Sequence, residues 1–179
     1  AYVIGDLRRQ LATPSVGNER VWRCTTAGTS GGSEPSWTLT KGSTTNDNGT
    51  VWTEVTGTST YGWNAPHARL LNAFSWSAAG DTIYVSNNHA ETQASSLTLS
   101  NSGAATSMMR VICVDDSASP PTSLATTATI TTTGSSFIDL PSYVHYYGIT
   151  FTAATSGSNG IFVNSGGSNS VILLDSCCL

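Results

Sequence analysis

The second half of the chain contains six carboxylates, and two of them, suitably placed, could carry out glycoside hydrolysis. The six are Asp81, Glu91, Asp115, Asp116, Asp139 and Asp175. Such a pair needs about 5–10 Å between its carboxyl groups and a raised pKa on one of them. Asp139 and Asp175 lie in strand-like blocks. They are 36 residues apart, which is not a whole number of the 22- to 24-residue repeats described below, so the sequence does not place them on one face. Asp115 and Asp116 precede a Ser-Ala-Ser-Pro-Pro loop, where aspartate usually caps a turn, so we assign no catalytic residue.

His89 and Glu91 could form an acid/base pair or part of a metal site, because alternate residues of a strand share a face. The sequence offers no third ligand beside them, so a structural corner that hydrogen-bonds the turn is the favoured interpretation. His67 and His145 also lack partners at catalytic spacing. Nucleophile-elbow, phosphate-loop and metal-binding motifs are absent, so we predict no metal and no cofactor.

The four cysteines are Cys24, Cys113, Cys177 and Cys178, and no two of them form a CxxC motif. This spacing argues against a zinc site. The adjacent Cys177 and Cys178 would point to opposite faces of a strand, so a disulfide between them would be strained. We expect buried free thiols.

Three tryptophans, Trp22, Trp37 and Trp52, could stack on sugar rings, because aromatic faces are broad apolar platforms. Each lies in a β-like block that needs filling, so a shared core is the favoured interpretation. Tyr61 and Trp63 lie in a Gly/Thr-rich linker and are better candidates for contact with a partner. These five aromatic residues are the candidate ligand-binding set.

The composition predicts an all-β protein. Charged residues make up only 10% of the chain, and Ser, Thr, Gly and Asn, which suit strands and tight corners better than helices, take their place. The net charge is −4, and the seven Lys and Arg residues form no basic stripe along the sequence, which argues against nucleic-acid binding. No apolar run approaches the roughly 20 residues that span a bilayer, so no membrane partner is expected.

Turn signals divide the chain into four segments. We predict an N-terminal arm over residues 1–15, a small Trp-rich β-module over 16–57, a linker with a short helix over 58–80, and a β-helix domain over 81–179. The Asn-Asp-Asn-Gly stretch at 46–49 is a strong turn signal within the module, which a helix could not absorb. Asn64 as a cap, Pro66 in the first turn and a stop at Gly80 predict one helix of about three turns.

After Gly80, brief apolar blocks alternate with polar linkers. Ile149 to Val171 spans 22 residues and Ile138 to Phe162 spans 24, within the range of repeat architectures. Stacked coils would bury the apolar faces that each coil alone leaves open, so we predict a short right-handed parallel β-helix. A β-sandwich or jelly roll, with similarly spaced turns, is the alternative.

Two stretches resemble parts of tailed-bacteriophage virion proteins. Residues 21–37, with Cys-Thr-Thr-Ala-Gly-Thr-Ser-Gly and Glu-Pro-Ser-Trp, and the closing Val-Trp-Thr-Glu at 51–54 resemble a small β-module of phage structural proteins. Residues 79–92, which include Gly-Asp-Thr-Ile-Tyr-Val, are similar to the first coil of pectate-lyase-like β-helices in such proteins. Residues 147–151 resemble a standard rung of these helices.

The resemblance implies a homotrimeric protein on the exterior of the virion, either a head-decoration or cement protein or part of a tail spike or fibre. Its expected partners are its own copies, other virion proteins such as the major capsid or tail proteins, and a host-surface glycan. The favoured function is structural and non-enzymatic; the alternative is a glycan-binding or polysaccharide-degrading tail spike. Tail spikes that degrade polysaccharide have longer solenoids than residues 81–179 allow. An apolar strand is followed by no polar cap before Leu179, so we expect a longer natural chain or a partner there.

Overall fold

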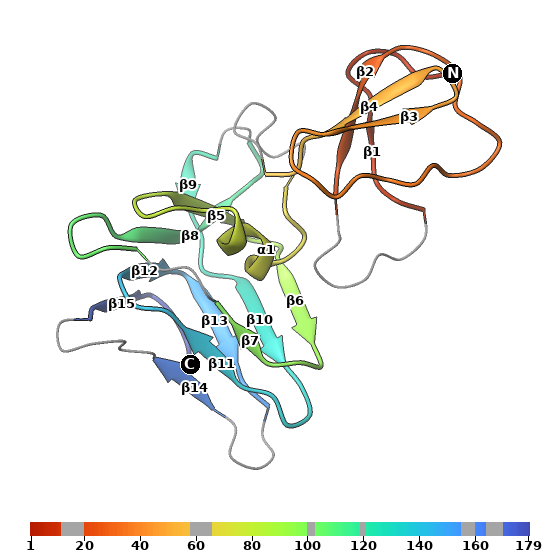
Figure 1. Ribbon diagram of the computed structural model, residues 1–179. Helices are drawn as coiled ribbons and strands as arrows, with labels where there is room; N and C mark the ends of the chain where they lie inside the picture. Colours follow the sequence, from red (N-terminus) through yellow and green to blue (C-terminus); the bar gives the residue numbers. More distant parts are fainter. Residues whose placement is uncertain (12–19, 58–65, 100–102, 119–120, 155–159, 164–169) are drawn as a thin grey trace. The chain divides into compact units, whose positions relative to one another are not determined.

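The computed structural model describes residues 1–11, 20–57, 66–99, 103–118, 121–154, 160–163 and 170–179 (Figure 1). The chain forms two compact units, residues 1–72 and 73–179. The fold is all-β with one short helix, as the composition predicts. We describe each unit on its own.

The first unit is a four-stranded antiparallel sheet in the order β1-β2-β4-β3. Its strands are β1 (Leu7–Arg8), β2 (Trp22–Thr26), β3 (Thr44–Asp47) and β4 (Thr50–Glu54). Asn48 and Gly49 alone connect β3 to β4, and both have positive φ, 49° and 90°. Two such residues make the type I′ turn that Asn-Gly favours in a two-residue hairpin.

The start of the chain is hydrogen-bonded to this sheet. Tyr2 and Gly28 exchange backbone hydrogen bonds, and the Gly5 amide donates to the carbonyl of Cys24. Leu7 and Arg8 then pair with β2. The described part of the predicted arm, residues 1–11, is therefore part of the module's sheet.

The helix α1 (Leu70–Ser75) is six residues long, shorter than the predicted three turns. Leu70 and Phe74, four residues apart, are buried, as the helical spacing predicts. The helix ends early because serine hydroxyls compete for the backbone: Ser77 Oγ donates to the Ala73 carbonyl over 2.6 Å. At the other end, Pro66 precedes the helix by a non-helical stretch, and the predicted cap Asn64 lies outside the described residues.

The second unit is a short parallel β-helix of three sheets. The first solenoid sheet consists of β5 (Thr82–Ser86), β8 (Met109–Asp115), β12 (Val144–Tyr147) and β15 (Ile172–Asp175). The second consists of β6 (Ala90–Gln93), β10 (Ala128–Thr132) and β13 (Ile149–Thr152). The third consists of β7 (Leu97–Thr98), β11 (Ile138–Leu140) and β14 (Ile161–Val163). Figure 1 shows the second sheet as three adjacent arrows.

Each coil contributes one strand to each sheet, and all the coil-to-coil pairings are parallel. This result excludes the β-sandwich alternative, whose strands pair antiparallel. The strand β9 (Ser123–Leu124) pairs antiparallel with the end of β8 and belongs to a loop between β8 and β10. A fourth coil begins with β15, after which Cys178 forms a parallel bridge to Thr150.

The predicted register of the coils is partly wrong. Ile138 pairs with Ile161, one residue before the predicted Phe162. Ile149 was expected to stack on Val171 but pairs with Ala128, and Val171 precedes β15, a strand of another sheet. Along the first sheet, Met109 pairs with Val144, 35 residues later, and Val144 pairs with Ile172, 28 residues later. The coil length varies because the loop that contains β9 enlarges the second coil, so no single period describes the stack.

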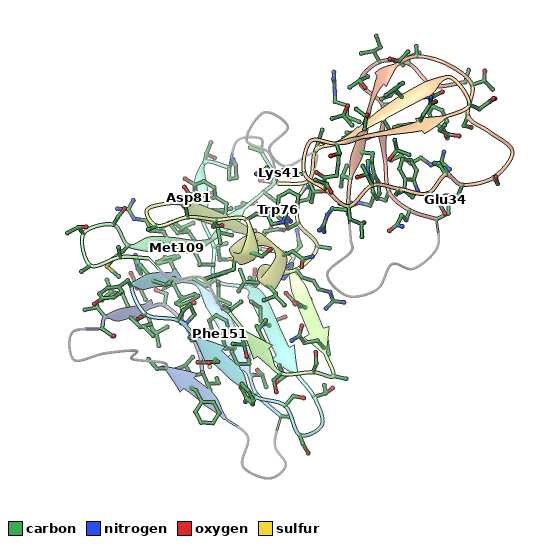
Figure 2. The ribbon with its side chains drawn as sticks, in the orientation of Figure 1. Glu34, Lys41, Trp76, Asp81, Met109 and Phe151 are labelled. Atoms are coloured by element: carbon green, nitrogen blue, oxygen red, sulfur yellow. The ribbon has the colours of Figure 1, made fainter. Side chains whose placement is uncertain are left out.

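The core of the solenoid is built from inward ladders. Val111 and Tyr146 are register partners and fully buried, as are Ala128 and Ile149. Met109 and Phe151 also point into this core (Figure 2). Phe74 of the helix is fully buried as well and stacks on Tyr146, with ring centroids 6.4 Å apart.

Gly148, between β12 and β13, makes the tightest corner. Its φ is +70°, and an added Cβ would overlap with the carbonyl oxygen of Ala125. Only glycine combines this backbone conformation with such a close backbone approach. The β12–β13 corner therefore depends on this one residue.

Candidate functional site

The candidate carboxylates do not gather in one place. Asp139 is on β11 in the third solenoid sheet, whereas Asp175 is on β15 in the first. Asp81 Oδ2 accepts a hydrogen bond from the Ala78 amide. Asp115 Oδ1 accepts one from the Ser117 amide, which lowers the pKa of Asp115. Among the described residues, no group of three or more His, Cys, Asp or Glu could hold a metal ion.

His89 and Glu91 do form a pair at the start of the second sheet. His89 Nε2 lies 3.3 Å from Glu91 Oε2, and Glu91 is 4% exposed. Glu91 is the register partner of Ile130, which is fully buried, so its carboxylate faces the interior of the first coil. The imidazole gives this buried carboxylate a polar partner, which is the usual requirement for burial of a charge.

The three candidate tryptophans form the core of the first unit. Trp22 and Trp52 are fully buried and Trp37 is 9% exposed. Trp37 stacks on Trp22 at 4.3 Å and meets Trp52 edge-on at 5.9 Å. The ring faces are thus occupied by one another, and a sugar could reach them only if the unit opened. Tyr61 and Trp63, the other two candidates, lie outside the described residues.

All four cysteines are free thiols. Cys24 and Cys113 are buried, Cys177 is half-buried and Cys178 is exposed. Burial raises the pKa of the Cys24 thiol, which keeps it protonated and unreactive. The two buried thiols serve as small apolar core groups.

The last coil of the solenoid leaves apolar side chains exposed. Leu174 continues the ladder of Val111 and Tyr146 but is 38% exposed, and Val163 continues from the buried Leu140 but is 48% exposed. The other exposed apolar residues of this end are Phe162, Val171, Leu173 and Leu179. Within the described chain, β14 and β15 each pair on one side only. We call this surface, formed by β14, β15 and residues 176–179, the open end.

A second surface, the outer face of the first solenoid sheet, was not found by sequence reasoning. Tyr84 is 56% exposed, and it lies in register with Ile112 and Tyr147 across β5, β8 and β12. Arg110 and His145 form a neighbouring register pair on the same face. In the sequence, the alternation of residues within each strand block indicates which side chains point outward. It does not give the register between strands, so it could not show that these outward side chains are neighbours.

Comparisons with protein-family models, curated proteins and solved structures gave no match. None of the helices in the described part of the chain has the length and apolar character needed to cross a membrane.

Proposed function

We propose that this chain is a structural component of a bacteriophage virion, located on the exterior of the particle, that works by assembly rather than catalysis. The open end is the observation that carries the proposal. Among the strands that the structure describes, β14 and β15 each keep one edge unpaired beside half-exposed leucines, and such an edge is the usual template for pairing with another chain. The resemblance of residues 21–37 and 79–92 to phage structural proteins supports the assignment to a virion.

The energetic reason for assembly is the buried area that the open end lacks. Full burial of a leucine contributes about 1.5–3 kcal/mol, so a leucine left nearly half exposed forgoes about 1 kcal/mol. Leu173 and Leu174 are 46% and 38% exposed. A partner that covers them and pairs with β15 would add this burial to a row of backbone hydrogen bonds. The partners we propose are copies of the chain, as a homotrimer, and other virion proteins such as the major capsid or tail proteins.

Immunoelectron microscopy on particles of the phage that encodes the chain tests the location. Antibodies raised against the first unit should label the outside of intact particles. Label that appears only after the particles are disrupted, or no label on either preparation, would contradict the proposal. Host capsular polysaccharide incubated with the purified chain should keep its length, because Asp139 and Asp175 lie in different sheets and Asp81 and Asp115 each accept a backbone hydrogen bond at a turn.

Recognition of a host-surface glycan is a second candidate function. The outer face of the first solenoid sheet favours it, because the exposed Tyr84 and the half-buried Tyr147 lie there in rows beside Arg110 and His145. Binding sites for sugars combine aromatic platforms with a few hydrogen-bonding groups. A virion protein could assemble through the open end and contact the host through this face.

A further inference from the structure

Two rows of outward side chains cross the first solenoid sheet. They run in register over β5, β8 and β12, with Tyr84, Ile112 and Tyr147 in one row and Thr82, Arg110 and His145 in the other. The residues between them on β8 and β12 point inward, since Val111 and Tyr146 are fully buried. The two rows therefore share one surface.

Arg110 is the only Lys or Arg among residues 73–179, a stretch that contains six Asp and Glu. It is exposed, and within the described chain its guanidinium makes no ion pair and no hydrogen bond. Left unpaired, its planar fork is available to bind a carboxylate with two parallel hydrogen bonds.

The tyrosine row supplies an apolar platform beside this cation. Tyr84 and Tyr147 are two strands apart, about 10 Å at the usual strand spacing, with Ile112 between them. An extended ligand of two or three linked rings can reach from one tyrosine to the other. Within the described chain, the phenol hydroxyls of both tyrosines and the ring nitrogens of His145 have no hydrogen-bond partner, so they can meet the hydroxyl groups of a sugar.

The charges of the face set the position of an acidic ligand. On the fourth strand of the sheet, Asp175 is the register partner of Tyr147 and lies at the far end of the tyrosine row. A carboxylate would be repelled there and attracted at Arg110, in the other row. An anionic ligand would therefore bind across β5, β8 and β12 and stop short of β15.

We propose that the outer face of β5, β8 and β12 binds an oligosaccharide that carries carboxylate groups, such as one built from uronic or sialic acids. The proposal rests on glycan recognition, the second candidate function above. Arg110 binds the carboxylate, Tyr84 and Tyr147 stack on the sugar rings, and His145 hydrogen-bonds a hydroxyl. All four of these residues are in the solenoid, and none of them belongs to the tryptophan core of the first unit.

Isothermal titration calorimetry with the full 179-residue chain tests the proposal. The probes are hexasaccharides of polygalacturonic acid, hyaluronan and polysialic acid, their carboxyl-reduced neutral forms, and a sulfated heparin hexasaccharide. We expect at least one acidic hexasaccharide to bind, and its reduced form to bind about tenfold more weakly or not at all. Arg110→Ala should give a similar loss, Arg110→Lys a partial one, and Tyr84→Phe should bind better than Tyr84→Ala.

Thr131→Ala, on the outer face of the second solenoid sheet, is the matched control and should bind like the unaltered chain. Circular dichroism should show that every variant keeps its fold. Failure of all three acidic hexasaccharides, preference for the sulfated one, or undiminished binding by Arg110→Ala would overturn the proposed ligand. If Arg110→Ala binds undiminished and a neutral hexasaccharide also binds, the chain recognises a glycan at another surface. Absence of binding to every probe, neutral ones included, would remove the second candidate function as well.

Discussion

The two units of this chain bury their apolar residues in different ways. The first unit encloses its core within about 70 residues, because three indole rings pack against one another on one face of an antiparallel sheet. The second builds its core by stacking coils, so each coil depends on the next, and within the described residues the last coil leaves apolar side chains exposed. The first unit is therefore self-contained, whereas in the second the half-exposed Leu173 and Leu174 could be buried further by a partner.

The two units also differ in charge. Residues 1–72 contain six Lys or Arg and five Asp or Glu, whereas residues 73–179 contain one and six. Solenoids of like charge repel one another, so burial at the open end has to outweigh that repulsion. Assembly should therefore strengthen as salt screens the charges, whereas an acidic glycan bound at Arg110 should be released.

Removal of one indole should break the first unit while sparing the second. Trp52→Ala should cost about 3–5 kcal/mol of unfolding free energy, because Trp52 is fully buried against Trp37 and Tyr2. Hydrogen exchange should show that β2 and β4 lose protection while β8 and β10 keep theirs. Trp52→Phe is the control and should lose less. Equal loss of protection in both units would show that the units are not separately stable.

In the solenoid the corresponding weak point is a corner rather than a large side chain. Gly148→Ala should cost about 2–4 kcal/mol, because it adds strain at positive φ to an overlap with the Ala125 carbonyl. Gly134→Ala is the matched control: its φ is also +70°, but an added Cβ would meet nothing within 4 Å, so only about 1 kcal/mol is expected. Chemical denaturation of both variants measures the difference, and equal costs would contradict the close approach.

The first unit should lose stability in acid. Burial, with Arg20 and Lys41 nearby, lowers the pKa of His67 to about 4 from its ordinary 6.5. The unfolded chain therefore binds a proton that the folded unit does not, so stability is constant above about pH 6.5 and falls as the pH drops towards 4. After solvent screening the loss is at most about 2 kcal/mol. Denaturation midpoints from pH 7 to 4 measure it, and a His67→Gln variant with an unchanged pH slope would refute the assignment.

At the open end we expect the smallest effect on folding. Leu174→Lys should change the unfolding free energy of the isolated chain by less than about 1 kcal/mol, since Leu174 is already 38% exposed. Phe151→Ala, in the fully packed part of the solenoid, should cost about 3–5 kcal/mol. Thermal unfolding of the two variants checks this contrast. A large loss for Leu174→Lys in a monomeric sample would mean that the open end is covered within the chain.

The sequence allowed much of the fold to be predicted but little of the register. Asn48 and Gly49 specify their turn by conformational preference alone, and Trp22, Trp37 and Trp52 needed no partner information to predict a shared core. Alternating apolar blocks indicated stacked coils, which the parallel pairings confirm. The pairing of particular blocks depends on loop lengths that leave no periodic signal, and the helix was predicted too long because serine competition is a local effect.

Of the two candidate surfaces, only the open end could be recognised in part from the sequence. The apolar block that begins at Val171 could be recognised from its sequence alone, and Leu173 and Leu174 within it are 46% and 38% exposed. The row formed by Tyr84, Ile112 and Tyr147 could not, because these residues are 28 and 35 positions apart and meet only through the register. Sequence reasoning favours residues that are close in the chain, such as His89 and Glu91, and the structure shows that this pair faces the interior of the first coil.

Sedimentation velocity of the 179-residue chain over a wide concentration range tests the central claim, that the open end is an assembly surface, most directly. The unaltered chain should sediment faster as its concentration rises, and Leu174→Lys should remain monomeric, while Thr131→Lys, on the outer face of the second solenoid sheet, should behave like the unaltered chain. A chain that stays monomeric at every concentration, or one whose association is unaffected by Leu174→Lys, would contradict the account.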